Sequence, residues 1–142
     1  RISPEANLLM KKGKKIVLAK PGLDGHDRGI QVVASALKEA GFGVIYLGLR
    51  QTPEAIVEVA LREKADVIAI SVLTGSHMAI FRNIMKRLKE KGGTHILVTG
   101  GGIIPEKDQQ TLQGLGVGKL FGPGTPLEEI ISYIRDWKPS KK

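Results

Sequence analysis

The sequence predicts an α/β protein whose central parallel sheet is covered by helices on both faces. Three observations lead to this fold class. Short apolar runs alternate with amphipathic segments along the whole chain. The amphipathic segments carry apolar residues at the three-to-four spacing of a helix. Glycines gather where the apolar runs end. Strands that alternate with helices imply right-handed crossovers and parallel pairing.

The first half of the chain supplies two strands and two helices. Residues 15–20 are a short apolar run that stops at Pro21-Gly22, which is typical of a buried strand. Residues 28–40 form an amphipathic helix ended by Gly41, and residues 44–47 form a second strand. Thr52-Pro53-Glu54 then begins a helix over 52–64, because it combines a capping threonine, a proline at the first position and an acid in the first turn.

The second half repeats the pattern around a more buried strand. Residues 66–73 are apolar at successive positions, as a central parallel strand requires. The remaining predicted elements are a helix at 78–91, a strand at 95–99, a short helix at 105–112, a weak strand at 119–121 and a last helix at 125–137.

Five such units suit a flavodoxin-like (Rossmann-type) sheet with the strand order 2-1-3-4-5. In sheets of this kind, ligands bind beyond the carboxyl ends of the strands, at the switch between the first and third strands. We expect one domain over residues 15–138, preceded by a basic extension at 1–14 and followed by a basic tail at 139–142.

Composition and charge exclude several classes of function. The chain has 142 residues, no cysteine and a net charge of +8. Disulfide frameworks, thiolate metal sites and cysteine nucleophiles are therefore excluded. Residues 1–14 and 138–142 each carry +3 of that charge, and aromatic residues are only 4%, so we do not expect nucleic-acid binding. With no apolar run of membrane-spanning length and no signal peptide in view, we expect a cytoplasmic protein without a membrane partner.

Polar residues and glycines concentrate in the loops that follow the first, third, fourth and fifth strands. These loops are residues 20–29, 71–77, 100–105 and 122–125. Glycine at four adjacent strand ends allows a backbone to approach a large ligand closely. The same glycines also suit tight strand-to-helix turns, so this alternative stays open.

His26 is the sharpest single candidate in these loops. Asp24 lies two residues earlier, so its carboxylate can bind one imidazole nitrogen and leave the other free as a base or a metal ligand. Lys20 can in turn hold that carboxylate ionised. A surface histidine beside a helix-capping aspartate remains the simpler interpretation of the pair alone. We assign no chemistry to His77, which begins a helix, or to His95, which opens a strand at the opposite edge.

Common sites of this fold do not match. A phosphate-accepting receiver domain needs an aspartate at the end of the third strand and a lysine at the end of the fifth, where this chain has Ser71 and Gly122. The first loop lacks the serines and threonines of a flavodoxin phosphate loop. Neither a G-x-G-x-x-G nor a Walker sequence follows the first strand.

Three linked motifs nevertheless match a known pattern. Asp24-x-His26-x-x-Gly29, Ser71-x-Leu73 and Gly101-Gly102 resemble the D-x-H-x-x-G, S-x-L and G-G signature of cobalamin-binding domains. The gaps between them, 41 and 27 residues, look like those of the family. The longer run Gly22-Leu23-Asp24-Gly25-His26-Asp27-Arg28-Gly29 is similar specifically to the acyl-CoA mutases, and the resemblance extends over residues 14–138.

The resemblance implies a role for each matching residue. His26 would be the lower axial ligand to cobalt, Asp24 would bind its far nitrogen, and Lys20 would lie behind Asp24. Ser71 would bind the displaced benzimidazole, with Leu73 packed nearby. The cofactor-binding candidates are Lys20, Asp24, Gly25, His26, Asp27, Arg28, Gly29, Ser71, Leu73, Gly101, Gly102, Gly122 and Thr125. Beyond ligation of the cofactor, no catalytic residue is expected on this chain.

The resemblance also implies an activity and a partner. In the acyl-CoA mutases, adenosylcobalamin supplies radical chemistry that rearranges the carbon skeleton of the substrate. The acyl-CoA site of the family lies in a (β/α)₈ barrel, which needs about 250 residues. We therefore expect a small subunit that forms a hetero-oligomer with a large barrel subunit, with methylmalonyl-CoA favoured over isobutyryl- or 2-hydroxyisobutyryl-CoA. Alternatives are a corrinoid-carrying module of a methyltransferase and a non-enzymatic cobalamin carrier or sensor.

Overall fold

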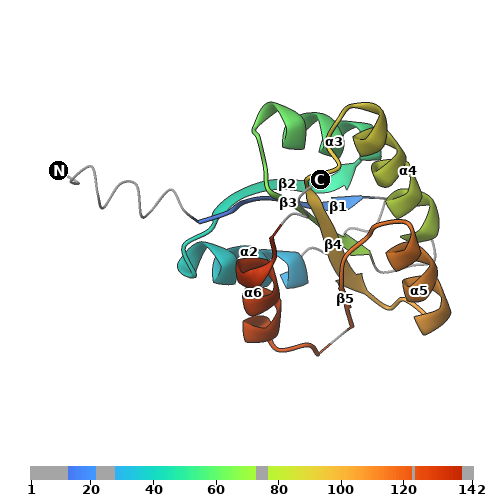
Figure 1. The fold of residues 1–142 in the computed structure, drawn as a ribbon. Helices are drawn as coiled ribbons and strands as arrows, with labels where there is room; N and C mark the ends of the chain where they lie inside the picture. Colours follow the sequence, from blue (N-terminus) through green and yellow to red (C-terminus); the bar gives the residue numbers. More distant parts are fainter. Residues whose placement is uncertain (1–12, 22–27, 73–76, 123, 139–142) are drawn as a thin grey trace.

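The protein is a five-stranded parallel sheet in the order β2-β1-β3-β4-β5, with helices on both faces (Figure 1). The computed structural model describes residues 13–21, 28–72, 77–122 and 124–138. The observed strand order is the flavodoxin-like order that the sequence predicts, so the predicted fold class is confirmed.

Strands and helices alternate along the chain. The strands are β1 (Lys15–Pro21), β2 (Gly43–Gln51), β3 (Val67–Val72), β4 (Leu97–Gly102) and β5 (Leu120–Phe121). The helices are α2 (Arg28–Glu39), α3 (Pro53–Arg62), α4 (His77–Glu90), α5 (Glu106–Gly114) and α6 (Leu127–Asp136). None of the described helices combines the length and the hydropathy that crossing a membrane requires.

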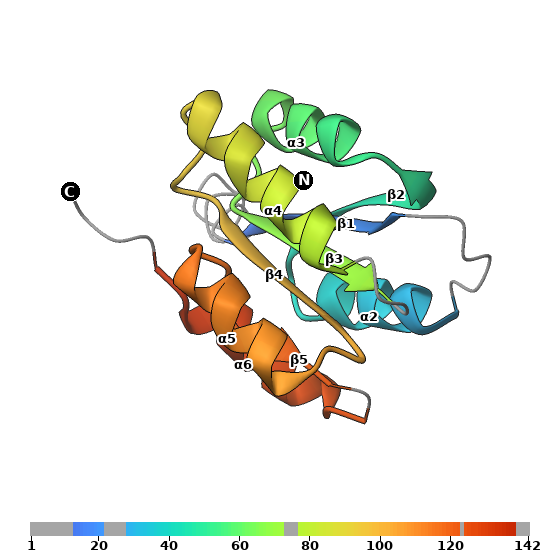
Figure 2. The same cartoon turned by 90° about the vertical axis from the view of Figure 1, so that its right-hand side faces the viewer.

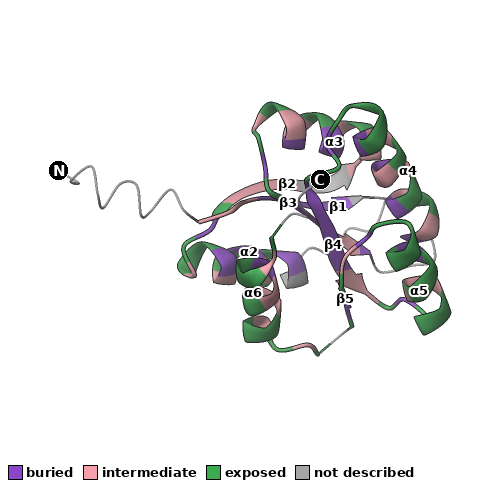
Figure 3. Ribbon diagram, in the orientation of Figure 1, coloured by how far each residue is buried: buried purple, intermediate pink, exposed green. Residues whose placement is uncertain are grey.

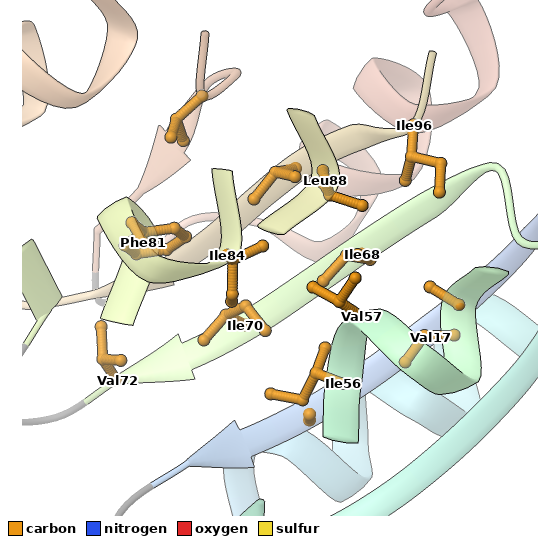
Figure 4. Close-up of a cluster of buried hydrophobic side chains, with 14 of the residues drawn as sticks. Val17, Ile56, Val57, Ile68, Ile70, Val72, Phe81, Ile84, Leu88 and Ile96 are labelled. Carbon is orange, nitrogen blue, oxygen red and sulfur yellow. The ribbon is translucent and has the colours of Figure 1, made fainter. Parts of the chain in front are cut away.

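Each face of the sheet has its own core. Helices α3, α4 and α5 cover one face, where side chains such as Ile56, Phe81 and Leu112 pack with Val17 and Ile70 of the strands (Figure 4). Helices α2 and α6 lie beside each other on the opposite face and contribute the second core. Figure 2 looks onto the layer with α4 and α5: α4 crosses in front of the strands, and α6 lies behind α5.

The central strands end in register. Ser71 of β3 pairs with Gly101 of β4, and Gly101 also pairs with Phe121 of β5. Burial is greatest along these inner strands, as the colouring of β4 in Figure 3 shows. The register therefore brings the ends of three strands to one edge of the sheet, where the second and third predicted motifs meet.

Several predicted boundaries need correction. The second strand runs over Gly43–Gln51, which is longer than predicted, and β1 pairs with it through two register shifts. His95 lies in a turn rather than in a strand, since β4 starts at Leu97. Hydrogen bonds from Ile96 to Gly93 and from Leu97 to Asp66 shape that turn. The start of α4 at His77 is confirmed.

The three consecutive glycines belong to β4 and not to the loop after it. Residues without side chains gave no apolar signal, but their backbones pair with Ile70, Ser71 and Val72 of β3. The division of the chain into an extension, a domain and a tail stays a prediction, because residues 1–12 and 139–142 lie outside the described residues.

Candidate cobalamin site

A cavity of about 110 Å³ lies between the sheet and the helix pair α2 and α6. The helices line it with Ile30, Val33, Leu37, Ile130 and Ile134. The strands line it with Leu18, Ala69, Ile70, Ser71, Thr99, Gly100, Gly101 and Phe121. If the solvent-exposed space at its mouth is included, the volume of the cavity is about 520 Å³. Its walls are almost entirely apolar, as suits a flat organic group held by a few polar contacts.

Two hydroxyl groups lie in this apolar lining. The Thr99 hydroxyl is buried and donates to the carbonyl oxygen of Lys119, so its hydrogen bond is used within the protein. Ser71 is partly buried at the end of β3, and its hydroxyl has no hydrogen-bond partner among the described residues. Ser71 is thus the polar group that the cavity offers to a ligand.

The glycines of β4 leave space at the same strand end. A Cβ atom on Gly101, which lines the cavity, would come 2.9 Å from the carbonyl oxygen of Phe121. Gly102 has a φ of +145°, and a Cβ there would collide with the carbonyl oxygen of Val72. Gly102 is therefore required by the backbone itself, and glycine at position 101, beside the cavity, allows β4 and β5 to approach closely.

Lys20 is buried near the carboxyl end of β1, with only 2% of its surface exposed. Lysine is seldom buried to this degree without a partner, and Lys20 does take part in an interaction. Its position in the strand places it immediately before the loop that carries the first motif.

The structure describes only some of the other predicted site residues. Asp24, Gly25, His26, Asp27 and Leu73 lie outside the described residues. Arg28 and Gly29 are the first residues of α2, and their side chains are not described. The axial-ligand role of His26 and its contact with Asp24 therefore stay predictions.

Gly122 and Thr125 form the turn between β5 and α6. The Thr125 hydroxyl donates to the carbonyl oxygen of Gly122 at 2.7 Å. Neither residue lines the cavity, although Phe121, the residue before them, does. Their proposed place at the border of the groove also stays a prediction.

Sequence reasoning missed most of the residues that shape the cavity. Ile30, Val33 and Leu37 were identified only as the apolar face of a helix. Thr99 gave no signal, because one threonine in an apolar run has no distinctive spacing. The gap between the helix pair and the sheet depends on how α2 and α6 pack together, which periodicity does not report.

Polar side chains on the α4–α5 side form a separate pair. His77, at the first position of α4, is 5% exposed, and its Nε2 atom lies 2.7 Å from Oδ2 of Asp108 in the first turn of α5. Among the described residues, no cluster of three or more histidines and carboxylates is placed to hold a metal ion.

Curated relatives of the chain include subunits of acyl-CoA mutases. It is 45% identical over 121 residues to the "2-hydroxyisobutanoyl-CoA mutase small subunit" of Aquincola tertiaricarbonis, covering 85% of this chain and 89% of that one. It is 42% identical to the "Pivalyl-CoA mutase small subunit" of Xanthobacter autotrophicus, covering 84% and 80% of the two chains. It is 41% identical to the methylmalonyl-CoA mutase of Rhizobium meliloti, covering 90% of this chain but only 18% of that larger one.

Solved structures agree on the fold. A cobalamin-binding protein from Desulfitobacterium hafniense matches with a TM-score of 0.75 and 23% identity, over 89% of this chain and 60% of that one. The monomethylamine corrinoid protein of Methanosarcina barkeri matches with a TM-score of 0.74 and 22% identity, over 94% and 62% of the two chains. The family model described as "B12 binding domain" matches residues 14–139. The chain therefore belongs to the B12-binding domain family.

Proposed function

We propose that this chain is the adenosylcobalamin-binding subunit of an acyl-CoA mutase. The observation that carries the proposal is the apolar cavity between α2, α6 and the sheet, which reaches the strand ends that bear the motifs and is lined by Ser71, whose hydroxyl has no partner within the described part of the chain. The two small subunits that this chain covers almost from end to end support the mutase assignment over other corrinoid proteins.

The residues present fit the nucleotide tail of cobalamin. An aromatic ring system entering the cavity would pack against Ile30, Ile130 and Phe121. Ser71 would donate a hydrogen bond to the ring nitrogen, with Leu73 nearby. Gly101 would leave space for the tail, since a Cβ at that position is directed at the β5 backbone beside the cavity. Gly122 and Thr125 would border the groove where it opens.

The loop after β1 would hold the cobalt end of the cofactor. His26 would donate an imidazole nitrogen as the lower axial ligand, and Asp24 would fix its tautomer by binding the other nitrogen. Lys20, buried at the end of β1, would hold the Asp24 carboxylate ionised. Gly25, Asp27, Arg28 and Gly29 would shape the loop and the start of α2 around this ligand.

The rest of the reaction belongs to a partner. Bound adenosylcobalamin supplies a carbon-centred radical, and this chain binds, orients and shields that group from water on one side. The acyl-CoA would occupy the barrel of a separate large subunit, so the isolated chain would be inactive as a mutase. Methylmalonyl-CoA is the first substrate to test. The names of the two small-subunit relatives make 2-hydroxyisobutanoyl-CoA and pivalyl-CoA the next ones.

A spectroscopic titration tests the proposal. The purified chain is titrated with adenosylcobalamin, followed by ultraviolet–visible absorption, and the Co(II) form is examined by electron paramagnetic resonance for splitting by an axial nitrogen. We expect nitrogen splitting in the wild type that responds to isotopic labelling of the histidine nitrogens, and loss of that response in His26→Ala, where only the cofactor's own base could supply a nitrogen. The matched control is His95→Ala, because His95 is exposed at the opposite edge of the sheet.

Three outcomes are informative. Splitting in the wild type that does not respond to labelled histidine, or a response that persists in His26→Ala, would overturn the axial-ligand assignment. An absence of cobalamin binding, both alone and with a mutase large subunit added, would overturn the whole proposal. Cobalamin binding without turnover of any of the three acyl-CoA substrates in the presence of large subunits would favour the methyltransferase or carrier alternatives.

A further inference from the structure

The pair His77–Asp108 lies on the opposite side of the sheet from the cavity, yet it joins the two helices that follow the second and third motifs. His77 begins α4, the helix that follows the Ser71-x-Leu73 loop. Asp108 lies in the first turn of α5, the helix that follows Gly101-Gly102. Their side chains meet at 2.7 Å, between Nε2 and Oδ2.

Burial separates this contact from an ordinary surface ion pair. The His77 side chain is 6% exposed and the Asp108 side chain 32%. A hydrogen bond between an imidazole and a carboxylate in such a site is stronger and more directional than one in water. The first turn of a helix also favours a carboxylate, because the helix dipole is positive there. The contact is therefore suited to hold the two helix starts at a fixed separation.

A second contact extends the attachment to the loop after β4. The side-chain amide of Gln109, next to Asp108, donates to the carbonyl oxygen of Ile104 at 2.8 Å. The first turn of α5 therefore contacts the start of α4 through Asp108. Through Gln109 it also contacts the connection that follows β4. The Gln109 contact is with the backbone shortly after Gly101, and the Asp108 contact is with a side chain shortly after Ser71, and both Gly101 and Ser71 line the cavity.

Packing connects the start of α4 to the cavity itself. Phe81 lies one turn after His77 and is fully buried. A Cβ atom on Gly100 would come 3.0 Å from Cζ of Phe81, so the ring packs directly on the backbone of β4. Gly100 also lines the cavity on the other face of the sheet. A shift of the amino end of α4 would therefore be passed through Phe81 to the wall of the cavity.

We propose that His77 and Asp108 are positioning residues for cobalamin binding, which set the ends of β3 and β4 without touching the cofactor. This inference rests on the proposed function for the identity of the ligand. It requires that loss of the pair loosen the strand ends and weaken cobalamin binding more than it weakens the fold.

The test compares Asp108→Ala with Glu54→Ala as a matched control. Glu54 also lies in the first turn of a helix and also bonds a side chain of α4, at 2.7 Å to Arg87, but it contacts the opposite, carboxyl-terminal part of that helix. Both variants lose one carboxylate contact to α4. His77→Gln serves as the conservative rescue, since its amide nitrogen can replace Nε2 as a donor to Asp108.

Two readouts are measured on each variant. Amide hydrogen exchange of the cofactor-free protein reports the backbone of Ser71, Val72 and Gly100–Gly102. Titration with adenosylcobalamin reports Kd. We expect Asp108→Ala to accelerate exchange at these strand ends and to raise Kd by about tenfold. Glu54→Ala should leave both within about twofold, and His77→Gln should lie close to the wild type.

Unchanged exchange and unchanged Kd in Asp108→Ala would overturn the inference. Faster exchange with an unchanged Kd would also overturn it, because the pair would then only stabilise the fold. Failure of the wild type to bind cobalamin is a separate result, which overturns the proposed function. In that case the inference is overturned as well, because no cobalamin remains for the pair to position, whatever the exchange data show.

Discussion

The three consecutive glycines of β4 face different neighbours, so a methyl group has a different effect at each. At Gly100 it would collide with the Ile70 carbonyl oxygen, at Gly101 it would approach the Phe121 carbonyl oxygen, and at Gly102 it would collide with that of Val72. Gly102 also has a φ of +145°, which side-chain-bearing residues rarely adopt. The G-G motif therefore combines a requirement of the backbone with a requirement of the cavity.

A series of alanine substitutions separates these requirements. Gly101→Ala should lower the free energy of unfolding by about 1–3 kcal/mol through overpacking and should also weaken cobalamin binding. Gly102→Ala should destabilise the protein more, because strain adds to the collision. Gly114→Ala, at the end of α5, is the control, since nothing lies within 4 Å of its Cβ position. Denaturant unfolding and cofactor titration measure the two effects, and equal Kd values for Gly101→Ala and the wild type would contradict the role of Gly101.

At the scale of elements, β5 depends on α6 for its place in the sheet. It has only two residues, Leu120 and Phe121, which pair with Gly100 and Gly101. Tyr133 of α6 accepts a hydrogen bond from the Lys119 backbone at 2.9 Å, and its ring meets Phe121 edge-on with centroids 5.6 Å apart. Because Phe121 lines the cavity, this contact couples α6 to the candidate site.

Removal of the Tyr133 hydroxyl tests that dependence. Tyr133→Phe keeps the ring contact but leaves the Lys119 amide without its acceptor. We expect a loss of about 1 kcal/mol in the free energy of unfolding and faster exchange of the Lys119 amide. Thr111→Val is a suitable control, because its hydroxyl makes only an exposed bond within α5. If the Lys119 amide exchanged at the wild-type rate, β5 would not depend on this hydrogen bond.

The elements also show how far the sequence predicts this fold. The start of α3 followed from local chemistry, and the structure confirms that Thr52 accepts a bond from the Ala55 amide, with Pro53 at the first position. The predicted carboxyl end of β4 was wrong, because glycines carry no apolar signal in the sequence. Their backbones nevertheless pair with β3. Local sequence patterns therefore predict an element correctly when its own side chains determine it. They fail when backbone pairing with a strand distant in the sequence determines it.

The residues of the candidate site were also only partly predictable from the sequence. Ser71, Gly101 and Lys20 were selected from motifs, and the structure places the first two on the cavity and buries the third at the end of β1. Thr99 and the His77–Asp108 contact were not foreseen, since each depends on residues that only the fold brings together. Spacing along the chain does not report such contacts across elements.

At the scale of the whole molecule, the two faces of the sheet are unequal. The face covered by α3, α4 and α5 has a continuous buried core, whereas the α2 and α6 face contains the cavity. Empty space in a core lowers stability, because the surrounding atoms lose packing contacts. The α2 and α6 face should therefore open more easily in the cofactor-free protein and gain most when a ligand fills it.

Hydrogen exchange measured by mass spectrometry checks this asymmetry. Without cofactor, α2 and α6 should exchange faster than α3 and α4. With adenosylcobalamin at about one hundred times its Kd, the free energy of unfolding should rise by about 2.7 kcal/mol, and the added protection should concentrate in α2 and α6. Added protection confined to α3 and α4 would contradict binding in the cavity.

One contact at the opposite edge has a consequence for how such a domain is used. The Lys14 ammonium donates to the Arg135 carbonyl oxygen at 2.7 Å, so the start of β1 and the end of α6 meet, far from the strand ends that line the cavity. A peptide linker attached at either point would leave the cofactor side open. The fold is thus compatible with both arrangements found among its relatives, a small subunit in Aquincola tertiaricarbonis and one part of a much longer chain in Rhizobium meliloti.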